Sequence, residues 1–177
     1  MKIIAICDTN IFIDLIEIKL LDEFFALPWE IHTTDMIIHE LNVANQKKRV
    51  VDYQTRGVLR VKGYDMNEML TLTKFYSLQR ETTKASIQDC SVLLYTMEKG
   101  YTLLTGGIKL EEVATNAGID VHNIIYIIDK LVHMRLLSKE TAAYKLEELI
   151  LLNPRLPMSE IERRVKLWRG IKKGDSL

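Results

Sequence analysis

Short apolar runs alternate with longer amphipathic segments along the first two thirds of the chain. The first run, residues 3–7, is rich in β-branched side chains and is typical of a buried strand. Similar strands are predicted at residues 30–33, 58–64 and 102–104, and a short one at Val121. The intervals between most successive strands are long enough to hold a helix.

Helical spacing of apolar positions fills these intervals. Helices are predicted over residues 10–27, with an interruption, and over residues 34–46, 65–79, 86–100 and 107–118. The polar segments 46–57 and 80–84 are predicted as a helix end with a loop and as a loop, respectively. Ser86 and Asp89 have capping-box spacing, and Gly100 is a typical helix stop.

This alternation predicts an α/β fold, a parallel β-sheet sandwiched by helices, over residues 1–122. The remaining residues, 123–177, are predicted as a C-terminal helical extension packed on the same domain. Ser138 and Ser159 are expected to cap helices within it.

Composition is consistent with one folded domain. The 177 residues are 47% hydrophobic, with 24 basic and 24 acidic residues, so disorder and a strong overall field are both disfavoured. The two cysteines, Cys7 and Cys90, argue against a secreted disulfide framework. No apolar stretch is long enough to span a bilayer, and we expect a cytoplasmic protein.

Three acids stand at positions where apolar neighbours predict burial. Asp8 follows the first strand, and Glu40 and Asp89 each lie on an otherwise apolar helical segment. Buried carboxylates are costly unless they are compensated, and hard cations such as Mg²⁺ or Mn²⁺ prefer carboxylate oxygens. Ordinary roles remain open for each acid: an N-cap for Asp8, a boundary glutamate for Glu40, and a capping box for Asp89.

Four sequence blocks, taken together, resemble a PIN domain. They are Ile4-Ala5-Ile6-Cys7-Asp8-Thr9-Asn10, His39-Glu40-Leu41, Ala85-Ser86-Ile87-Gln88-Asp89-Cys90 and Leu103-Leu104-Thr105-Gly106-Gly107-Ile108-Lys109-Leu110. They occur in the family's order over residues 1–122, which would then be the catalytic domain. Residues 123–170 resemble, less specifically, the helical tail of one bacterial and archaeal group of these proteins.

The resemblance implies a Mg²⁺- or Mn²⁺-dependent endoribonuclease, often the toxin of a toxin–antitoxin pair. Asp8, Glu40 and Asp89 would be the catalytic acids and metal ligands. Asn10 and Thr105 would help to orient ligands or a water. The expected partners are an RNA substrate, an antitoxin protein and a second copy of the chain in a homodimer.

Gly107 departs from the family pattern, because an aspartate usually occupies this position. Loss of one carboxylate weakens cation binding, although Mg²⁺ normally keeps several waters and three acids can still hold it. Glu111 or Glu112, one turn later, could replace the missing acid, but both are also ordinary first-turn helix acids.

Basic residues mark candidate RNA contacts. Lys47, Lys48 and Arg49 form one cluster. The tail adds Arg155, Arg163, Arg164, Lys166, Arg169, Lys172 and Lys173. Basic side chains supply most sequence-independent affinity for phosphates, but a solvated helix face is the simpler explanation of each cluster.

Two other functions compete with the nuclease. A catalytically weakened PIN-like scaffold that binds RNA or protein would explain Gly107. A phosphatase or receiver-like protein using Asp8 fits less well, because the residue two positions later is Asn10 rather than a second aspartate.

Overall fold

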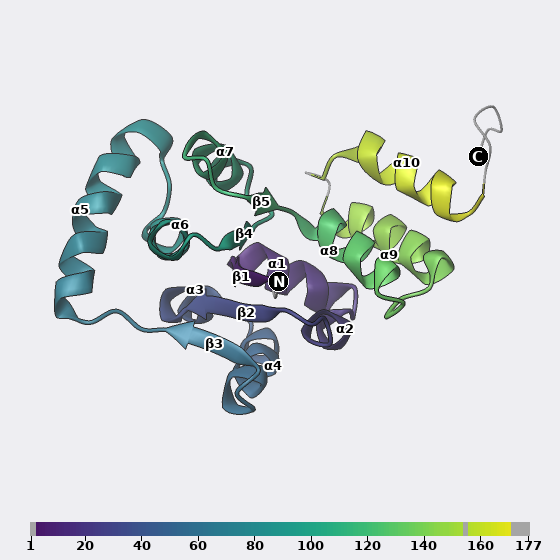
Figure 1. Ribbon diagram of the computed structural model, residues 1–177, viewed down its shortest axis with the longest axis horizontal. Helices are drawn as coiled ribbons and strands as arrows, with labels where there is room; N and C mark the ends of the chain where they lie inside the picture. Colours follow the sequence, from purple (N-terminus) through teal and green to yellow (C-terminus); the bar gives the residue numbers. More distant parts are fainter. Residues whose placement is uncertain (1–2, 154–155, 171–177) are drawn as a thin grey trace. The chain divides into compact units, whose positions relative to one another are not determined.

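The computed structural model describes residues 3–153 and 156–170, and its strands form one five-stranded parallel sheet (Figure 1). The strand order is β3-β2-β1-β4-β5, and every neighbouring pair is parallel. The strands are β1 (Ile4–Cys7), β2 (Glu30–Thr34), β3 (Leu59–Lys62), β4 (Thr102–Leu104) and β5 (Val121–His122). The predicted α/β fold with a parallel, helix-flanked sheet is confirmed.

The central position of β1 decides where the chemistry-bearing residues emerge. Ile6 of β1 pairs with His32 on one side and with Leu103 on the other. Asp8 continues the pairing, since its N–H donates to the carbonyl oxygen of Leu104 at 3.0 Å. In parallel sheets, binding sites form beyond the carboxyl ends of the strands, and Asp8 and Thr105 both lie at that edge.

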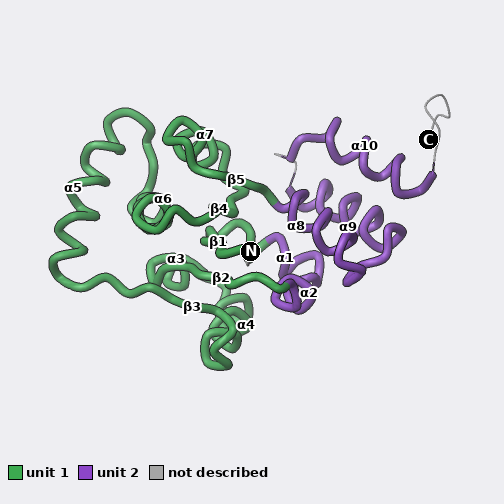
Figure 2. The backbone as a smooth tube through the Cα atoms, in the orientation of Figure 1, with its two compact units in different colours: residues 1–13, 28–123 green, residues 14–27, 124–177 purple. Residues whose placement is uncertain are grey.

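The chain divides into two compact units (Figure 2). Unit 1 comprises Met1–Ile13 and Pro28–Asn123, and unit 2 comprises Asp14–Leu27 and Ile124–Leu177. Helix α1 (Thr9–Glu17) begins in unit 1 and ends in unit 2. Residues 14–27 therefore group with the C-terminal helices although they precede β2 in the sequence.

Unit 1 is built around α6 (Ile87–Lys99), which packs on β1, β2 and β4. The other helices of this unit are α3 (Asp35–Glu40), α4 (Ala44–Thr55), α5 (Met66–Thr83) and α7 (Ile108–Asn116). Helices α3, α5 and α7 contact α6, whereas α4 contacts β3. Both sides of α6 are thus occupied, which explains why most of its first three turns are buried.

Unit 2 is a helical assembly of α2 (Leu21–Phe25), α8 (Ile124–His133), α9 (Lys139–Leu152) and α10 (Met158–Trp168). Helix α8 is its most apolar part and buries four isoleucines and Leu131. Arg164 on α10 donates to both carboxylate oxygens of Asp129 on α8, at 2.9 and 2.8 Å. This pair fixes α10 to α8 in addition to the apolar packing.

The segment after Glu40 differs from the sequence-based prediction. We predicted one helix over residues 34–46 and then a loop, but α3 ends at Glu40 and α4 covers most of the predicted loop. Leu41 and Val43 have extended backbones, which separates the two helices. Polar composition hid α4, because only Val50 and Tyr53 on its inner face are buried.

Helix ends were predicted with mixed success. The capping box of Ser86 and Asp89 is present with both hydrogen bonds, and Gly100 ends α6 with a φ of 65°. Ser138 caps α9 as expected, but Ser159 lies inside α10 because that helix begins at Met158 after Pro157. Helix α5 also continues through Thr83 rather than ending at Gln79. Its last turn is polar, which made it look like a loop.

In the described part of the chain, every helix is too short or too polar to cross a membrane.

Asp14 on α1 makes stability depend on pH. Its side chain is 7% exposed and accepts long contacts of 3.4 Å from the amide of Asn153, while burial raises its pKa from 3.8 to about 6. The folded state therefore keeps a proton that the unfolded state releases between about pH 4 and 6. Stability falls as pH rises through this window and remains lower above it.

We predict that Asp14→Asn raises the free energy of unfolding at pH 7.5 by about 1–3 kcal/mol, because the buried charge is removed. The gain should shrink toward pH 4, where wild-type Asp14 is protonated. Urea unfolding at both pH values measures this difference. Glu162→Gln, at an exposed position on α10, is the matched control. An equal gain at both pH values would contradict the assignment to Asp14.

Candidate active site

Asp8 is the centre of the candidate site. It directly follows β1, its side chain is 2% exposed, and its Oδ1 accepts a hydrogen bond from the backbone N–H of Thr9 at 2.7 Å. The hydroxyl of Thr105 donates to Oδ2 at 2.8 Å, and the amide of Asn10 donates to the same oxygen at 3.3 Å. Both carboxylate oxygens are therefore oriented by donors from two strand ends.

The electrostatics of Asp8 reflect two opposing effects. Burial raises the pKa of its carboxyl to about 6, and the nearby charge of Asp89 adds to the rise. The hydrogen bonds from Thr105, Thr9 and Asn10 lower it. An ionised carboxylate at this position is thus costly in the protein alone and would gain from a cation beside it.

Asp89 lies in the first turn of α6. Its Oδ2 accepts from the backbone N–H of Ser86 at 2.9 Å, and its own N–H donates to the Ser86 hydroxyl at 3.0 Å. This capping box uses one carboxylate oxygen and fixes the side chain at the helix N-terminus, where the helix dipole favours a negative charge. Asp89 can cap α6 and still influence Asp8, since its charge raises the pKa of the Asp8 carboxyl.

Glu40 is connected to the Asp8 site by a hydrogen bond with Thr9. It is the last residue of α3, and its Oε2 accepts a hydrogen bond from the hydroxyl of Thr9, the residue next to Asp8. Sequence reasoning did not single out Thr9, although its position between Asp8 and Asn10 could have suggested it. Among residues 3–153 and 156–170, no group of three His, Cys, Asp or Glu side chains forms a recognisable metal-binding cluster.

The turn at Gly107 has room for a side chain. The backbone φ of Gly107 is −88°, which any residue adopts, and its N–H donates to the Thr105 hydroxyl at 3.0 Å. A Cβ built there would lie 3.5 Å from Thr105 Oγ1 and 3.7 Å from Asn10 Nδ2, ordinary contact distances. Glu111 and Glu112 are both exposed on α7.

Three sequence neighbours of the acids lie outside the proposed ligand set. Cys7 and Cys90 are free and buried, and burial raises the pKa of the Cys90 thiol to about 11, so it stays protonated. His39 is exposed, and its Nδ1 contacts the carbonyl oxygen of Asp35 at 2.7 Å.

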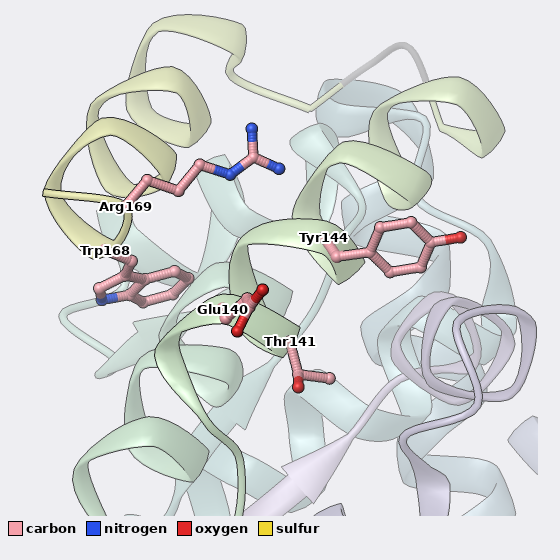
Figure 3. A pocket seen from close by; sticks show the side chains of 5 residues that line it. All are labelled: Glu140, Thr141, Tyr144, Trp168 and Arg169. Carbon is pink, nitrogen blue, oxygen red and sulfur yellow. The ribbon is translucent and has the colours of Figure 1, made fainter. Parts of the chain in front are cut away.

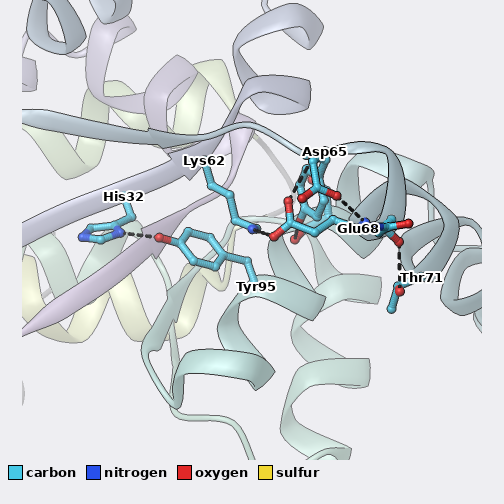
Figure 4. A network of polar contacts seen from close by, with 9 residues as sticks. His32, Lys62, Asp65, Glu68, Thr71 and Tyr95 are labelled. Atoms are coloured by element: carbon cyan, nitrogen blue, oxygen red, sulfur yellow. Dashed lines mark hydrogen bonds and ion pairs between the residues drawn. The ribbon is translucent and has the colours of Figure 1, made fainter.

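Polar contacts connect β2 to α6 and β3 to α5 (Figure 4). Lys62 Nζ donates to Glu68 Oε1 at 2.5 Å, and Glu68 and Asp65 form the reciprocal capping box that opens α5. On β2, His32 Nδ1 lies 2.7 Å from Oη of Tyr95, a residue of α6. These contacts fix the β3–α5 connection and the middle of α6, the helix that carries Asp89.

The basic candidates separate into two groups. Lys47, Lys48 and Arg49 lie near the start of α4, soon after the helix that carries Glu40, and remain at least partly exposed. Arg164 and Arg169 are instead held by ion pairs with Asp129 and Glu147 in unit 2. Arg163 is exposed and Lys166 half-buried. Arg155, Lys172 and Lys173 lie outside the described residues.

A shallow cavity of about 760 Å³ lies within unit 2, between α9 and α10 (Figure 3). Its lining residues are Glu140, Thr141, Tyr144, Trp168 and Arg169. Trp168 therefore borders an open pocket.

Comparisons with known proteins agree with this geometry. Residues 4–169 match the family model DUF3368, described as a PIN domain. No curated protein matches the chain significantly. The structure is similar to the crystal structure of PAE2754 from Pyrobaculum aerophilum, with a TM-score of 0.51 and 14% sequence identity over 75% of this chain and 99% of that one.

At 14% identity, the structural similarity supports the fold alone, whereas the family match covers nearly the whole chain. PIN domains are generally nucleases that use divalent metal ions. The predicted resemblance is confirmed, and this chain belongs to the PIN-domain family.

Proposed function

We propose that this protein is a Mg²⁺- or Mn²⁺-dependent endoribonuclease whose site is centred on Asp8. The observation that supports it most is the environment of this carboxylate: it is nearly fully buried, receives three hydrogen bonds, and has a second acid, Asp89, close enough to raise its pKa. Ionising the buried Asp8 at the carboxyl edge of a parallel sheet, with the half-buried Asp89 nearby, is costly without a cation.

The donor chemistry fits a hard divalent ion. Mg²⁺ usually binds through one or two carboxylates and keeps several waters, so Asp8 and Asp89 satisfy its requirement for protein ligands. Glu40 is the third proposed ligand, tied by its hydrogen bond to Thr9 beside Asp8. When bound, the metal would activate water and neutralise charge developing on the phosphodiester.

The protein's own contribution is orientation. Thr105 and Asn10 both donate to Oδ2 of Asp8, and the backbone N–H of Thr9 holds Oδ1. The Thr9 hydroxyl orients Glu40, and Ser86 orients Asp89. Each of the three acids thus has a short polar neighbour that restricts its rotamers, and this preorganisation reduces the cost of assembling the site on metal binding.

RNA is the proposed substrate, with Lys47, Lys48 and Arg49 as phosphate contacts on α4. The role as a toxin, an antitoxin partner and a homodimer stay predictions. The cytoplasmic location, expected from the apolar pattern of the sequence, stays a prediction as well. Gly107 favours a second candidate, a PIN scaffold with weakened chemistry that binds RNA or protein, because it removes a carboxylate next to Asn10.

Metal should stabilise the protein through Asp89. At free Mn²⁺ about a hundredfold above its Kd, binding should add about 2.7 kcal/mol to the free energy of unfolding. Asp89→Asn should lose most of this gain but keep α6 intact, because the amide oxygen can still accept from the Ser86 N–H. Melting temperatures with and without Mn²⁺ measure the effect. An unchanged Mn²⁺ shift in the variant would remove Asp89 from the ligand set.

Gly107→Asp should raise metal affinity and metal-dependent RNA cleavage roughly tenfold, equivalent to about 1.4 kcal/mol. The backbone and the space at this position accept a side chain, and the new carboxylate would stand near Asn10. Gly107→Asn is the control, with similar shape and no charge. Metal titration and a cleavage assay over several RNAs measure both quantities.

A gain in the Asp variant alone supports a weakened nuclease. Strong wild-type activity without gain, lost on Asp8→Asn, means that the existing acids suffice. No cleavage by any variant, despite Mn²⁺ binding, would favour the scaffold.

A further inference from the structure

Two buried hydroxyls connect the helices that carry Glu40 and Asp89. Thr34 ends β2 and caps α3, and Ser91 lies in α6; both side chains are 0% exposed. Their hydroxyl oxygens are 2.8 Å apart. We propose that Ser91 is a positioning residue that sets the placement of the two acids relative to each other. This inference rests on the proposed metal site.

Proton counting gives the contact a direction. The Ser91 hydroxyl donates to the carbonyl oxygen of Gln88 at 2.7 Å, which uses its only proton. Thr34 must therefore donate to Ser91, while Thr34 Oγ1 accepts from the N–H of Ile37 at 3.4 Å. The result is one continuous chain of hydrogen bonds from the first turn of α3 to the first turn of α6.

The end of this chain is the peptide group that precedes the Asp89 side chain. Gln88 supplies its carbonyl, held by Ser91, and Asp89 supplies its N–H, held by the Ser86 hydroxyl at 3.0 Å. On the other side of the turn, Tyr64 Oη donates to the carbonyl oxygen of Ser91 at 2.6 Å. The peptide group between Gln88 and Asp89 is thus fixed at both its carbonyl oxygen and its N–H.

The start of the chain constrains Glu40. Helix α3 has six residues, about one and a half turns, so the orientation of its first turn largely determines the position of its last residue. Thr34 caps that first turn, and α3 packs against α6. Removing the Ser91 hydroxyl would leave a buried donor at Thr34 without its partner and would take one hydrogen bond from the carbonyl oxygen of Gln88. The hydrogen-bonded connection between the helices that carry Glu40 and Asp89 would then be broken.

The test compares Ser91→Ala with Thr96→Val in the full chain. Thr96 is a buried residue of the same helix, about two turns beyond Asp89, and its hydroxyl donates to the carbonyl oxygen of Val92 within α6 at 2.6 Å. Both variants should lower the melting temperature, Ser91→Ala by more, since it loses the two hydrogen bonds of the Ser91 hydroxyl and Thr96→Val loses one. Calorimetric titration with Mn²⁺ and the kcat and KM of RNA cleavage at saturating Mn²⁺ are then measured.

We expect Ser91→Ala to weaken Mn²⁺ binding about tenfold and to lower kcat with little change in KM, and Thr96→Val to stay within about twofold of wild type. Equal Mn²⁺ affinities in the two variants would overturn the positioning role while the metal site stands. Absence of Mn²⁺ binding to wild type, or binding unchanged in Asp8→Asn, would overturn the proposed function and this inference together.

Tyr64→Phe provides a second variant if Ser91→Ala does not fold. It removes the bond to the Ser91 carbonyl and leaves the hydroxyl chain in place. A loss of Mn²⁺ affinity of about threefold is expected, smaller than for Ser91→Ala because only one restraint on the turn is lost. Wild-type affinity in Tyr64→Phe would contradict the inference.

Discussion

The carboxylate of Asp8 must be kept oriented although it is almost entirely removed from water, and the architecture of unit 1 follows from this constraint. Burial places it at the carboxyl end of the central strand, between the ends of β2 and β4. A buried acid requires donors or a cation, and the fold supplies three donors from Thr9, Asn10 and Thr105. The neighbouring Asp89 makes the charge still more costly, which is the physical reason for proposing a metal.

Hydroxyl side chains do most of the positioning around this acid. The hydroxyls of Thr9 and Thr105 donate to Glu40 and Asp8, and the Ser86 hydroxyl accepts from the backbone N–H of Asp89. The Thr34–Ser91 pair connects the two helices involved. Short side chains suit this task because few rotamers are lost and both a donor and an acceptor are available. The proposed site is therefore rigid in its ligands but limited in total charge, since Gly107 adds none.

Sequence blocks around the acids predicted the fold and its family correctly, because alternating strands and helices and four short motifs are local signals. The predictions failed where a helix has a mostly polar sequence. Helix α4 was predicted as mostly loop, since only two of its residues are buried. The helix predicted over residues 34–46 was also too long, because α3 ends at Glu40 and Leu41 has an extended backbone.

The sequence by itself determined the strand positions, the caps at Ser86 and Ser138, and the identity of Asp8, Glu40 and Asp89 as candidates, because each depends on residues within one or two turns. Only the tertiary structure decided what lies against those acids. Thr9 meets Glu40 across 31 positions, Ser91 meets Thr34 across 57, and Thr105 meets Asp8 across 97. Such pairs form when parallel strands align their carboxyl ends, and no local pattern encodes which side chains will then be neighbours.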